Sequence, residues 1–315
     1  MITNKFRRMF VAGIFLFMTL VSGSVAAGQY QRLVVFGDSL SDPGNAFALI
    51  QRVSVPPFEL IPDAPYARGG LHFSNGSTWV EQLATDLHLG MSAGPVLRAP
   101  GVFSNYAVGA ARARPGALDD LGSQVVSFLG DFGGAAPPDA LYVVFIGSND
   151  LRDALVALSM DPSGNTSFAY LNAALGAIND NLTTLASAGA RQFLVANAPD
   201  IGLTPAVRAQ GPAAQAAALA LVTAFNNGLE AIVSGLETNA PVHIARFDVY
   251  GILNQVVADP AAAGLTDAVD SCITPDTRAG AFCAQPDTYL FWDGIHPTRA
   301  GHTILAHRAE AVLAQ

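Results

Sequence analysis

The stretch LVVFGDSLSDPGN, residues 33–45, decides the fold that we expect for this chain. Its first four residues are apolar and partly β-branched, which favours a short buried strand. The residues that follow are Gly, Asp, Ser, Pro and Asn, which are typical of turns. Ser39 would therefore sit at a strand-to-helix turn, with an exposed hydroxyl near free backbone N–H groups that can bind an oxyanion. The alternative is an ordinary turn in which Ser39 only caps a helix.

Three more apolar runs have the same form, and each ends in a polar turn. They cover residues 141–146, 192–196 and 242–247, followed by Gly147-Ser148-Asn149-Asp150, Asn197-Ala198-Pro199-Asp200 and Asp248. The clearest helical patterns cover residues 78–87, 168–188, 213–237 and 300–313. Buried strands that alternate with helices predict an α/β fold with a parallel sheet covered on both faces. Ligands of such sheets bind beyond the carboxyl ends of the strands, where these turns would lie.

The N-terminus has the pattern of a secretory signal. Lys5, Arg7 and Arg8 precede an apolar run at residues 9–21, and small residues follow at 23–27. This order predicts a signal peptide at residues 1–27 that is removed on export to the periplasm or the medium. A membrane anchor is the alternative, but a spanning helix needs about 20 apolar residues and this run is shorter. We expect no membrane-spanning segment after it.

The remaining chain, residues 28–315, is expected to form one domain. It has no internal repeat and no linker rich in Pro, Gly or Ser, and the whole chain of 315 residues is 51% hydrophobic and 13% charged. The signal would take three of the 16 basic residues and none of the 25 acidic ones, which leaves a net charge of −12. An acidic surface repels phosphate backbones, so we expect no nucleic-acid partner.

Lysine chemistry is excluded by composition. Lys5 is the only lysine of the chain and lies in the predicted signal. A Schiff base, a Ser-Lys dyad and a Walker-type phosphate loop all need a lysine. Metal hydrolysis is also disfavoured, because no H-E-x-x-H motif occurs and His302 and His307 are five residues apart, so they do not share a helix face. We expect neither a metal nor an organic cofactor.

The two cysteines, Cys272 and Cys283, are expected to form a disulfide. An exported protein meets an oxidising compartment, in which such a bond is permitted. Closing this short loop would contribute roughly 2–3 kcal/mol in the chain-entropy model. Two unpaired thiols are the alternative.

A second polar cluster, DGIHPT, covers residues 293–298. An Asp three residues before a His can accept a hydrogen bond from the imidazole Nδ1, which leaves Nε2 free to take a proton from a serine. Asn149 would supply a side-chain N–H at another strand end, and Gly109 a backbone N–H without a blocking side chain. Read singly, Asp293 could cap the last helix, Gly109 could reflect close packing, and Asn149 could be a turn residue.

Taken together, these segments resemble the GDSL, or SGNH, hydrolase family. The matching blocks are GDSLSD at residues 37–42, NYAVGA at 105–110, GSND at 147–150 and DGIHP at 293–297. The resemblance implies a three-layer α/β/α sandwich with a flavodoxin-like sheet, and an esterase or lipase activity on a small-molecule or lipid ester. It implies Ser39 as nucleophile, His296 as base and Asp293 as its partner. The oxyanion would be held by the N–H groups of Ser39 and Gly109 and by the Asn149 amide.

Other functions remain as alternatives. The G-x-S-x-G pattern at residues 90–94 would make Ser92 the nucleophile, but no strand pattern precedes it. A lipid acyltransferase could use the same catalytic residues if the site excludes water. A non-catalytic glycan- or lipid-binding module would need no base at His296. The apolar side chains of residues 47–71 could form an acyl-chain surface or pack as core.

Overall fold

The computed structural model describes residues 29–116 and 119–315, so the predicted signal peptide lies outside the described residues. Its main sheet contains the parallel strands β1 (Arg32–Gly37), β2 (Ala140–Phe145), β3 (Gln192–Ala196) and β4 (His243–Phe247), in that spatial order. Residues 104–108 extend the sheet beyond β1: the Val35 N–H donates to Ser104 O and the Tyr106 N–H donates to Val35 O. With this segment counted second in the chain, the spatial order is 2-1-3-4-5, the flavodoxin-like order.

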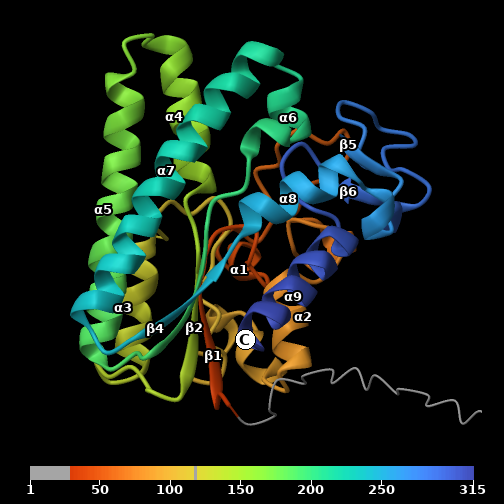
Figure 1. Ribbon diagram of the computed structural model, residues 1–315. Coiled ribbons are helices and arrows are strands. Elements are labelled where there is room, and N and C mark those ends of the chain that lie inside the picture. Colours follow the sequence, from red (N-terminus) through yellow and green to blue (C-terminus); the bar gives the residue numbers. More distant parts are fainter. Residues whose placement is uncertain (1–28, 117–118) are drawn as a thin grey trace, which may run out of the picture.

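Helices cover both faces of the sheet and form a three-layer α/β/α sandwich (Figure 1). Val34 and Phe36 of β1 belong to one buried cluster, and Leu33 and Val35 belong to the other. The first cluster packs under α3 (Leu121–Asp131), α4 (Ser148–Met160), α5 (Asn165–Ala188) and α7 (Pro212–Asn239). The second packs under α2 (Trp79–Asp86), α8 (Val249–Ala258) and α9 (Arg299–Leu313). The predicted fold class is confirmed.

The four apolar runs form β1 to β4, and the four helical patterns become α2, α5, α7 and α9, each within a few residues of the expected bounds. The sequence patterns did not single out α3, α4 and α8. The first turn of α4 is polar and starts inside the turn after β2, and α8 is rich in β-branched and aromatic residues near its start, which weakens a helical pattern. Asp248 nevertheless starts α8 by accepting the Gly251 N–H.

Among the described residues, α7 is the longest helix, and it is long and apolar enough to span a membrane by length and composition. Its buried side chains recur at helical spacing, from Ala218 through Leu221, Phe225 and Leu229 to Leu236. These residues belong to the cluster that covers the sheet, and α7 contacts α4 and α5. The apolar stripe of α7 is therefore used in packing the fold.

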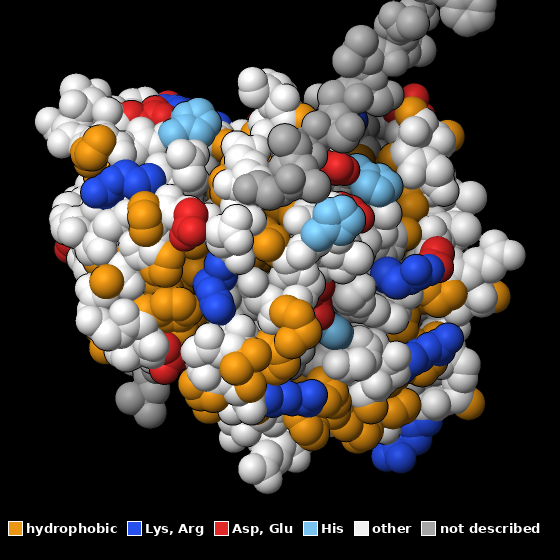
Figure 2. Space-filling view, turned by 90° about the horizontal axis from the view of Figure 1, so that it is seen from below, with side chains coloured by type: hydrophobic (Ala, Val, Ile, Leu, Met, Phe, Trp, Pro, Cys, Tyr) orange, Lys and Arg blue, Asp and Glu red, His pale blue; other side chains and the backbone are white. Residues whose placement is uncertain are grey.

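Two regions come together at one side of the molecule: the first lies between β1 and α2, and the second lies between α8 and α9. They include α1 (Asn45–Ile50), β5 (Asp267–Ser271) and β6 (Tyr289–Phe291), while the short α6 (Pro205–Arg208) lies above them. Phe58 and Tyr66 of the first region pack on Trp292 and Cys272 of the second. Figure 2 shows the face of the molecule at which the strands of the main sheet begin. Charged side chains of both signs are scattered there among apolar and uncharged ones.

Candidate active site

The predicted site residues meet at the carboxyl edge of the sheet. Ser39 lies in the turn after β1, Asn149 lies in the first turn of α4 after β2, and His296 lies in the loop between β6 and α9. All three are buried, at 8%, 5% and 3% exposure. The turns at Ser39 and Asn149 follow neighbouring parallel strands, which end on one edge of the sheet. His296 is brought there by the loop after β6, which belongs to a separate two-stranded sheet.

Ser39, His296 and Asp293 form a continuous chain of hydrogen bonds. The Ser39 Oγ lies 2.8 Å from His296 Nε2, and His296 Nδ1 lies 2.8 Å from Asp293 Oδ2 and 3.0 Å from Oδ1. Because a carboxylate can only accept, Nδ1 carries the proton and Nε2 is left as the acceptor for the serine O–H. This is the arrangement that a general base needs in order to activate a hydroxyl.

Asp293 is fixed by more than the imidazole. Its Oδ1 accepts the backbone N–H groups of Ile295 and His296, at 2.9 and 2.8 Å, and its Oδ2 accepts the Tyr66 hydroxyl at 3.0 Å. Burial and the neighbouring carboxylate of Asp293 raise the pKa of Tyr66, which therefore stays a donor at neutral pH. Tyr66 was not identified from sequence, because it lies 227 residues from Asp293 in a loop without a recognisable motif.

The turn that carries Ser39 is held from both sides. Asp42 accepts the N–H groups of Gly44, Asn45 and Ala46 within the turn, at 2.6–3.0 Å. On the other side, Gln124 of α3 bonds both the N–H and the carbonyl of Gly37, at 2.9 and 2.8 Å. These bonds fix the Ser39 backbone before any substrate arrives.

The structure differs from the sequence-based expectation at Gly109. Its N–H donates to Asp42 Oδ2 at 2.8 Å, so it is not free to bind an oxyanion. A Cβ on Gly109 would lie 2.2 Å from the Phe73 ring, which explains the glycine by close packing. The Phe73 ring in turn packs on the His296 imidazole, with the ring centres 5.3 Å apart.

The next N–H along the chain, that of Ala110, is better placed. Ala110 is exposed, lines the same cavity as Ser39 and has a φ of 67°, the left-handed region that favours glycine. Among the residues that the structure describes, the N–H groups of Ser39 and Ala110 have no hydrogen-bond acceptor. Asn149 donates one side-chain N–H to Ala111 O at 2.9 Å and keeps its second N–H for a ligand.

Two cavities open on Ser39 and His296. The inner cavity, with a volume of about 120 Å³, runs between α4, α6, α8 and α9, and its walls are mostly apolar. The outer cavity, of about 230 Å³, is bounded by Phe73, Ala110 and the side chains of Leu49 and Ile50. Residues 47–71 are therefore divided: Leu49, Ile50 and Ile61 line cavities, whereas Phe58 and Tyr66 pack as core.

Two ionisable groups, Asp38 and Arg152, line the inner cavity together with Ser39. Asp38 is fully buried, and burial raises the pKa of its carboxyl to about 7. The hydrogen bond from the Leu40 N–H acts in the opposite direction and lowers this pKa. Its second oxygen has no hydrogen-bond partner in the described part of the chain. Arg152 lines both cavities, and burial lowers the pKa of its guanidinium. Within residues 29–116 and 119–315, no group of three His, Cys, Asp or Glu side chains is placed to hold a metal ion.

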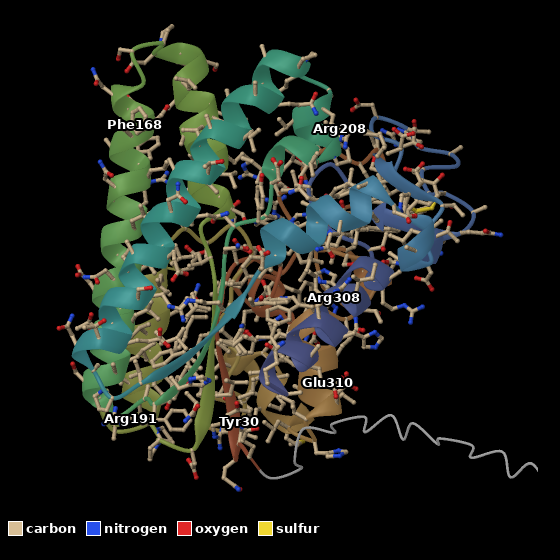
Figure 3. All side chains as sticks on the ribbon, in the orientation of Figure 1. Tyr30, Phe168, Arg191, Arg208, Arg308 and Glu310 are labelled. Carbon is tan, nitrogen blue, oxygen red and sulfur yellow. A yellow bond between two sulfur atoms is a disulfide. The ribbon has the colours of Figure 1, made fainter. Side chains whose placement is uncertain are left out.

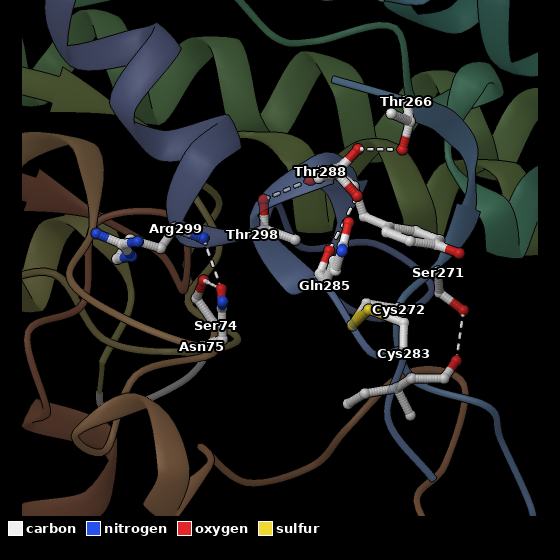
Figure 4. Close-up of a disulfide and its surroundings, with 12 residues drawn as sticks. Ser74, Asn75, Thr266, Ser271, Cys272, Cys283, Gln285, Thr288, Thr298 and Arg299 are labelled. Carbon is white, nitrogen blue, oxygen red and sulfur yellow. Dashed lines mark hydrogen bonds between the residues drawn. A yellow bond between two sulfur atoms is a disulfide. The ribbon is translucent and has the colours of Figure 1, made fainter. Parts of the chain in front are cut away.

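The remaining sequence candidates lie elsewhere. Cys272 and Cys283 are joined by a disulfide (Figure 4), and the Cys283 N–H donates to Cys272 O. This bond closes a loop in the region that packs on Tyr66 and Trp292. Ser92 lies in a short 3₁₀ helix, Gly90–Ala93, with no strand before it, so it lacks the setting of a nucleophile elbow.

The fold and this site together define an α/β/α-sandwich ester hydrolase with a Ser-His-Asp arrangement at the sheet edge. The sequence pattern of the GDSL-like Lipase/Acylhydrolase family matches residues 33–309, and the chain belongs to that family. It is accordingly a carboxylic ester hydrolase.

Known proteins with similar sequences carry the same description. A GDSL esterase/lipase of Arabidopsis thaliana is 30% identical over 344 residues, which cover 93% of this chain and 84% of that protein. A second one from the same plant is 29% identical over 322 residues, covering 90% and 88%. Among solved structures, the acetylxylan esterase Axe2 of Geobacillus stearothermophilus has 16% identity and a TM-score of 0.48, covering 91% of this chain and 95% of that one.

Proposed function

We propose that this protein is an exported serine esterase that hydrolyses carboxylic esters through an acyl-enzyme on Ser39. The observation that carries the proposal is the hydrogen-bond chain from Ser39 through His296 to Asp293. In the first half-reaction the Ser39 Oγ attacks the ester carbonyl carbon while its proton passes to His296 Nε2. The bond to the alcohol oxygen then breaks, and the alcohol leaves with the proton from His296.

The second half-reaction uses the same groups with water as nucleophile. Water gives a proton to His296 Nε2 and attacks the acyl carbon, and the Ser39 oxygen leaves and regains the proton. In both halves negative charge develops on the former carbonyl oxygen. The N–H groups of Ser39 and Ala110 and the second N–H of Asn149 are the donors proposed to hold it.

The inner cavity supports an apolar acyl group. It opens beside Ser39, and side chains such as Leu155, Val207, Ile252 and Ile304 form its walls. Burial of each methylene there is worth about 0.8 kcal/mol. Its volume of about 120 Å³ is several times the roughly 10–15 Å³ that one water-sized group needs, so it has room for several methylenes. We therefore expect butyryl and hexanoyl esters to be better substrates than acetyl esters.

The test is a series of nitrophenyl esters with acyl chains from two to twelve carbons. Wild-type protein should hydrolyse them, and should gain the mass of one acyl group on Ser39 when the reaction is quenched early. The Ser39→Ala variant should lose both properties, whereas Ser92→Ala, the matched control, should keep them. Failure of the folded wild-type protein to react with a fluorophosphonate probe would instead favour the binding module.

Acyl transfer is the second candidate, and one finding favours it. The phosphatidylcholine-sterol acyltransferase of Aeromonas hydrophila is 23% identical over 357 residues, which cover 96% of each chain. The acyl-enzyme would then pass its acyl group to an alcohol in place of water. Adding an acceptor alcohol to the ester series, and measuring ester product against free acid, separates the two reactions.

Export and domain organisation complete the proposal. Residues 1–27 would direct the chain to an oxidising compartment, and residues 28–315 would fold as one domain. The disulfide between Cys272 and Cys283 is consistent with such a compartment. Sequencing the N-terminus of protein recovered from the periplasm or the medium should give a start near residue 27 or 28. Recovery of uncleaved protein in the cytoplasm would contradict it.

A further inference from the structure

One arginine at the site has a position that hydrolysis of a neutral ester does not require. Arg152 follows Asn149 by one helical turn on α4 and lines both the inner and the outer cavity. Ser39, Asn149 and His296 also line both cavities, so Arg152 borders the same part of the site as the proposed nucleophile. In the described part of the chain it makes no hydrogen bond and no ion pair within 4.0 Å.

The neighbouring arginines show how unusual this is. Arg112 and Arg114 are both paired with Asp153, and Arg114 is also paired with Asp150 at 2.9 Å. Those contacts occupy the carboxylates of α4 that could have served Arg152. Arg152 is partly exposed, and Asp153, Asp38 and Asp293 attract its charge without forming a hydrogen bond to it. Its guanidinium N–H groups therefore have no protein acceptor in the described part of the chain. A ligand anion would restore its hydrogen bonds.

In the described part of the chain, none of the other acidic groups around the cavities bonds to the Arg152 guanidinium, although Asp38 and Asp293 attract its charge. Asp293 is bonded to His296 and Tyr66, and Asp63 is paired with Arg52 at 2.8 Å. Asp119 interacts with Arg112. Asp38 contacts the inner cavity, but its carboxyl makes no hydrogen bond to the guanidinium.

We propose that Arg152 binds an anionic group, a phosphate or a carboxylate, that the alcohol part of the substrate carries near the ester oxygen. The inference rests on the proposed esterase function and names its substrate class. The acyl chain would take the apolar inner cavity, so the alcohol lies toward the outer cavity, within reach of Arg152. The planar guanidinium fork can donate two parallel N–H bonds to either anion. Arg152 would thus be a specificity-determining residue for the esters that this enzyme accepts.

The experiment compares three hexanoyl esters that share the acyl group: hexanoylglycerol, hexanoylglycerol 3-phosphate and the hexanoyl ester of glyceric acid. Wild-type protein should have the higher kcat/KM on at least one anionic ester. Arg152→Gln should lower that value by about 10- to 100-fold, as expected for a charged hydrogen bond, and should lower hydrolysis of hexanoylglycerol by a clearly smaller factor. The anionic ester with the larger loss identifies the group that is bound.

Two further variants keep the result interpretable. Arg152→Lys retains the charge without the fork and should recover part of the lost activity. Arg308→Gln removes a positive charge from the exposed side of α9 (Figure 3) and should leave all three rates unchanged. Inorganic phosphate should inhibit hydrolysis of the neutral ester by wild-type protein, and less so for Arg152→Gln.

The outcomes separate this inference from the proposed function. Hydrolysis of the neutral ester with no preference for either anionic ester would overturn the role of Arg152 and leave the esterase intact. An equal loss on all three esters in folded Arg152→Gln protein would also overturn it. No hydrolysis of any ester by wild-type protein would contradict the proposed function itself.

Discussion

The hydroxyl of Tyr66 offers the sharpest test of how the site is organised. It donates to Asp293 Oδ2 at 3.0 Å, and its ring packs edge-on against Trp292 with centroids 5.6 Å apart. Tyr66→Phe removes only the hydroxyl and keeps the ring in its packed place. The substitution therefore leaves the carboxylate of Asp293 with its remaining donors, Ile295 N–H, His296 N–H and the imidazole.

The expected effect follows from the charge of the acceptor. A hydrogen bond to an ionised group contributes about 1.5–3 kcal/mol, and each 1.36 kcal/mol corresponds to about tenfold in rate. Three donors still hold Asp293, so we expect the lower end of this range. The kcat of Tyr66→Phe should fall about tenfold. Its KM should change less than about twofold, because Tyr66 lines neither cavity.

The assay is steady-state hydrolysis of nitrophenyl butyrate, with thermal unfolding measured on the same samples. Tyr106→Phe is the matched control, because its hydroxyl also donates to a carboxylate, Asp131 Oδ2 at 2.8 Å, but lies outside the site. It should lose stability and keep kcat. Wild-type kcat in Tyr66→Phe, or an equal loss of kcat in both variants, would refute the idea that the Tyr66 hydroxyl orients Asp293.

Four other outcomes are expected. Asn149→Ala should lower kcat by about 100- to 1,000-fold with folding unchanged; an active variant would remove Asn149 from the oxyanion site. Ala110→Gly should relieve the positive φ of 67° and raise the free energy of unfolding by about 0.5–1 kcal/mol, measured in urea; a less stable variant would contradict the strain. Replacing Cys272 and Cys283 together by serine should cost about 3 kcal/mol of stability, since they are 11 positions apart in sequence; unchanged stability would contradict this contribution of the disulfide. Burial lowers the pKa of His302 to about 3, below its ordinary value of 6.5. Between pH 6.5 and 3 the unfolded chain therefore binds a proton at His302 that the folded protein does not, so stability is lost as the pH falls. Between pH 6.5 and 4, His302→Leu should lose less stability than wild type, by at least about 1 kcal/mol. Equal losses in the two proteins would contradict this.

The sheet and its layers could be predicted from sequence because their signals are local. A buried strand such as LVVF at residues 33–36 needs only an apolar, β-branched run followed by a turn, and a helix such as α9 needs only its own periodicity. The polar turns at Ser39, Asn149 and His296 could be recognised in the sequence for the same reason. Parallel strands bring the turns at Ser39 and Asn149 to one edge whatever their separation along the chain, whereas the loop after β6, a strand of a separate two-stranded sheet, brings His296 there.

The identity of the oxyanion donors and the support of Asp293 were decided by the tertiary structure. Gly109 and Ala110 are neighbours in one motif, and only the contact with Asp42 shows which N–H is occupied and which is left for a ligand. The bond from Tyr66 to Asp293 depends in the same way on segments far apart in sequence. So does the finding that, within the described residues, Arg112 and Arg114 are paired and Arg152 is not. Hydrogen bonds are satisfied by whichever partner lies within about 3 Å in the folded chain, and no local pattern specifies that partner.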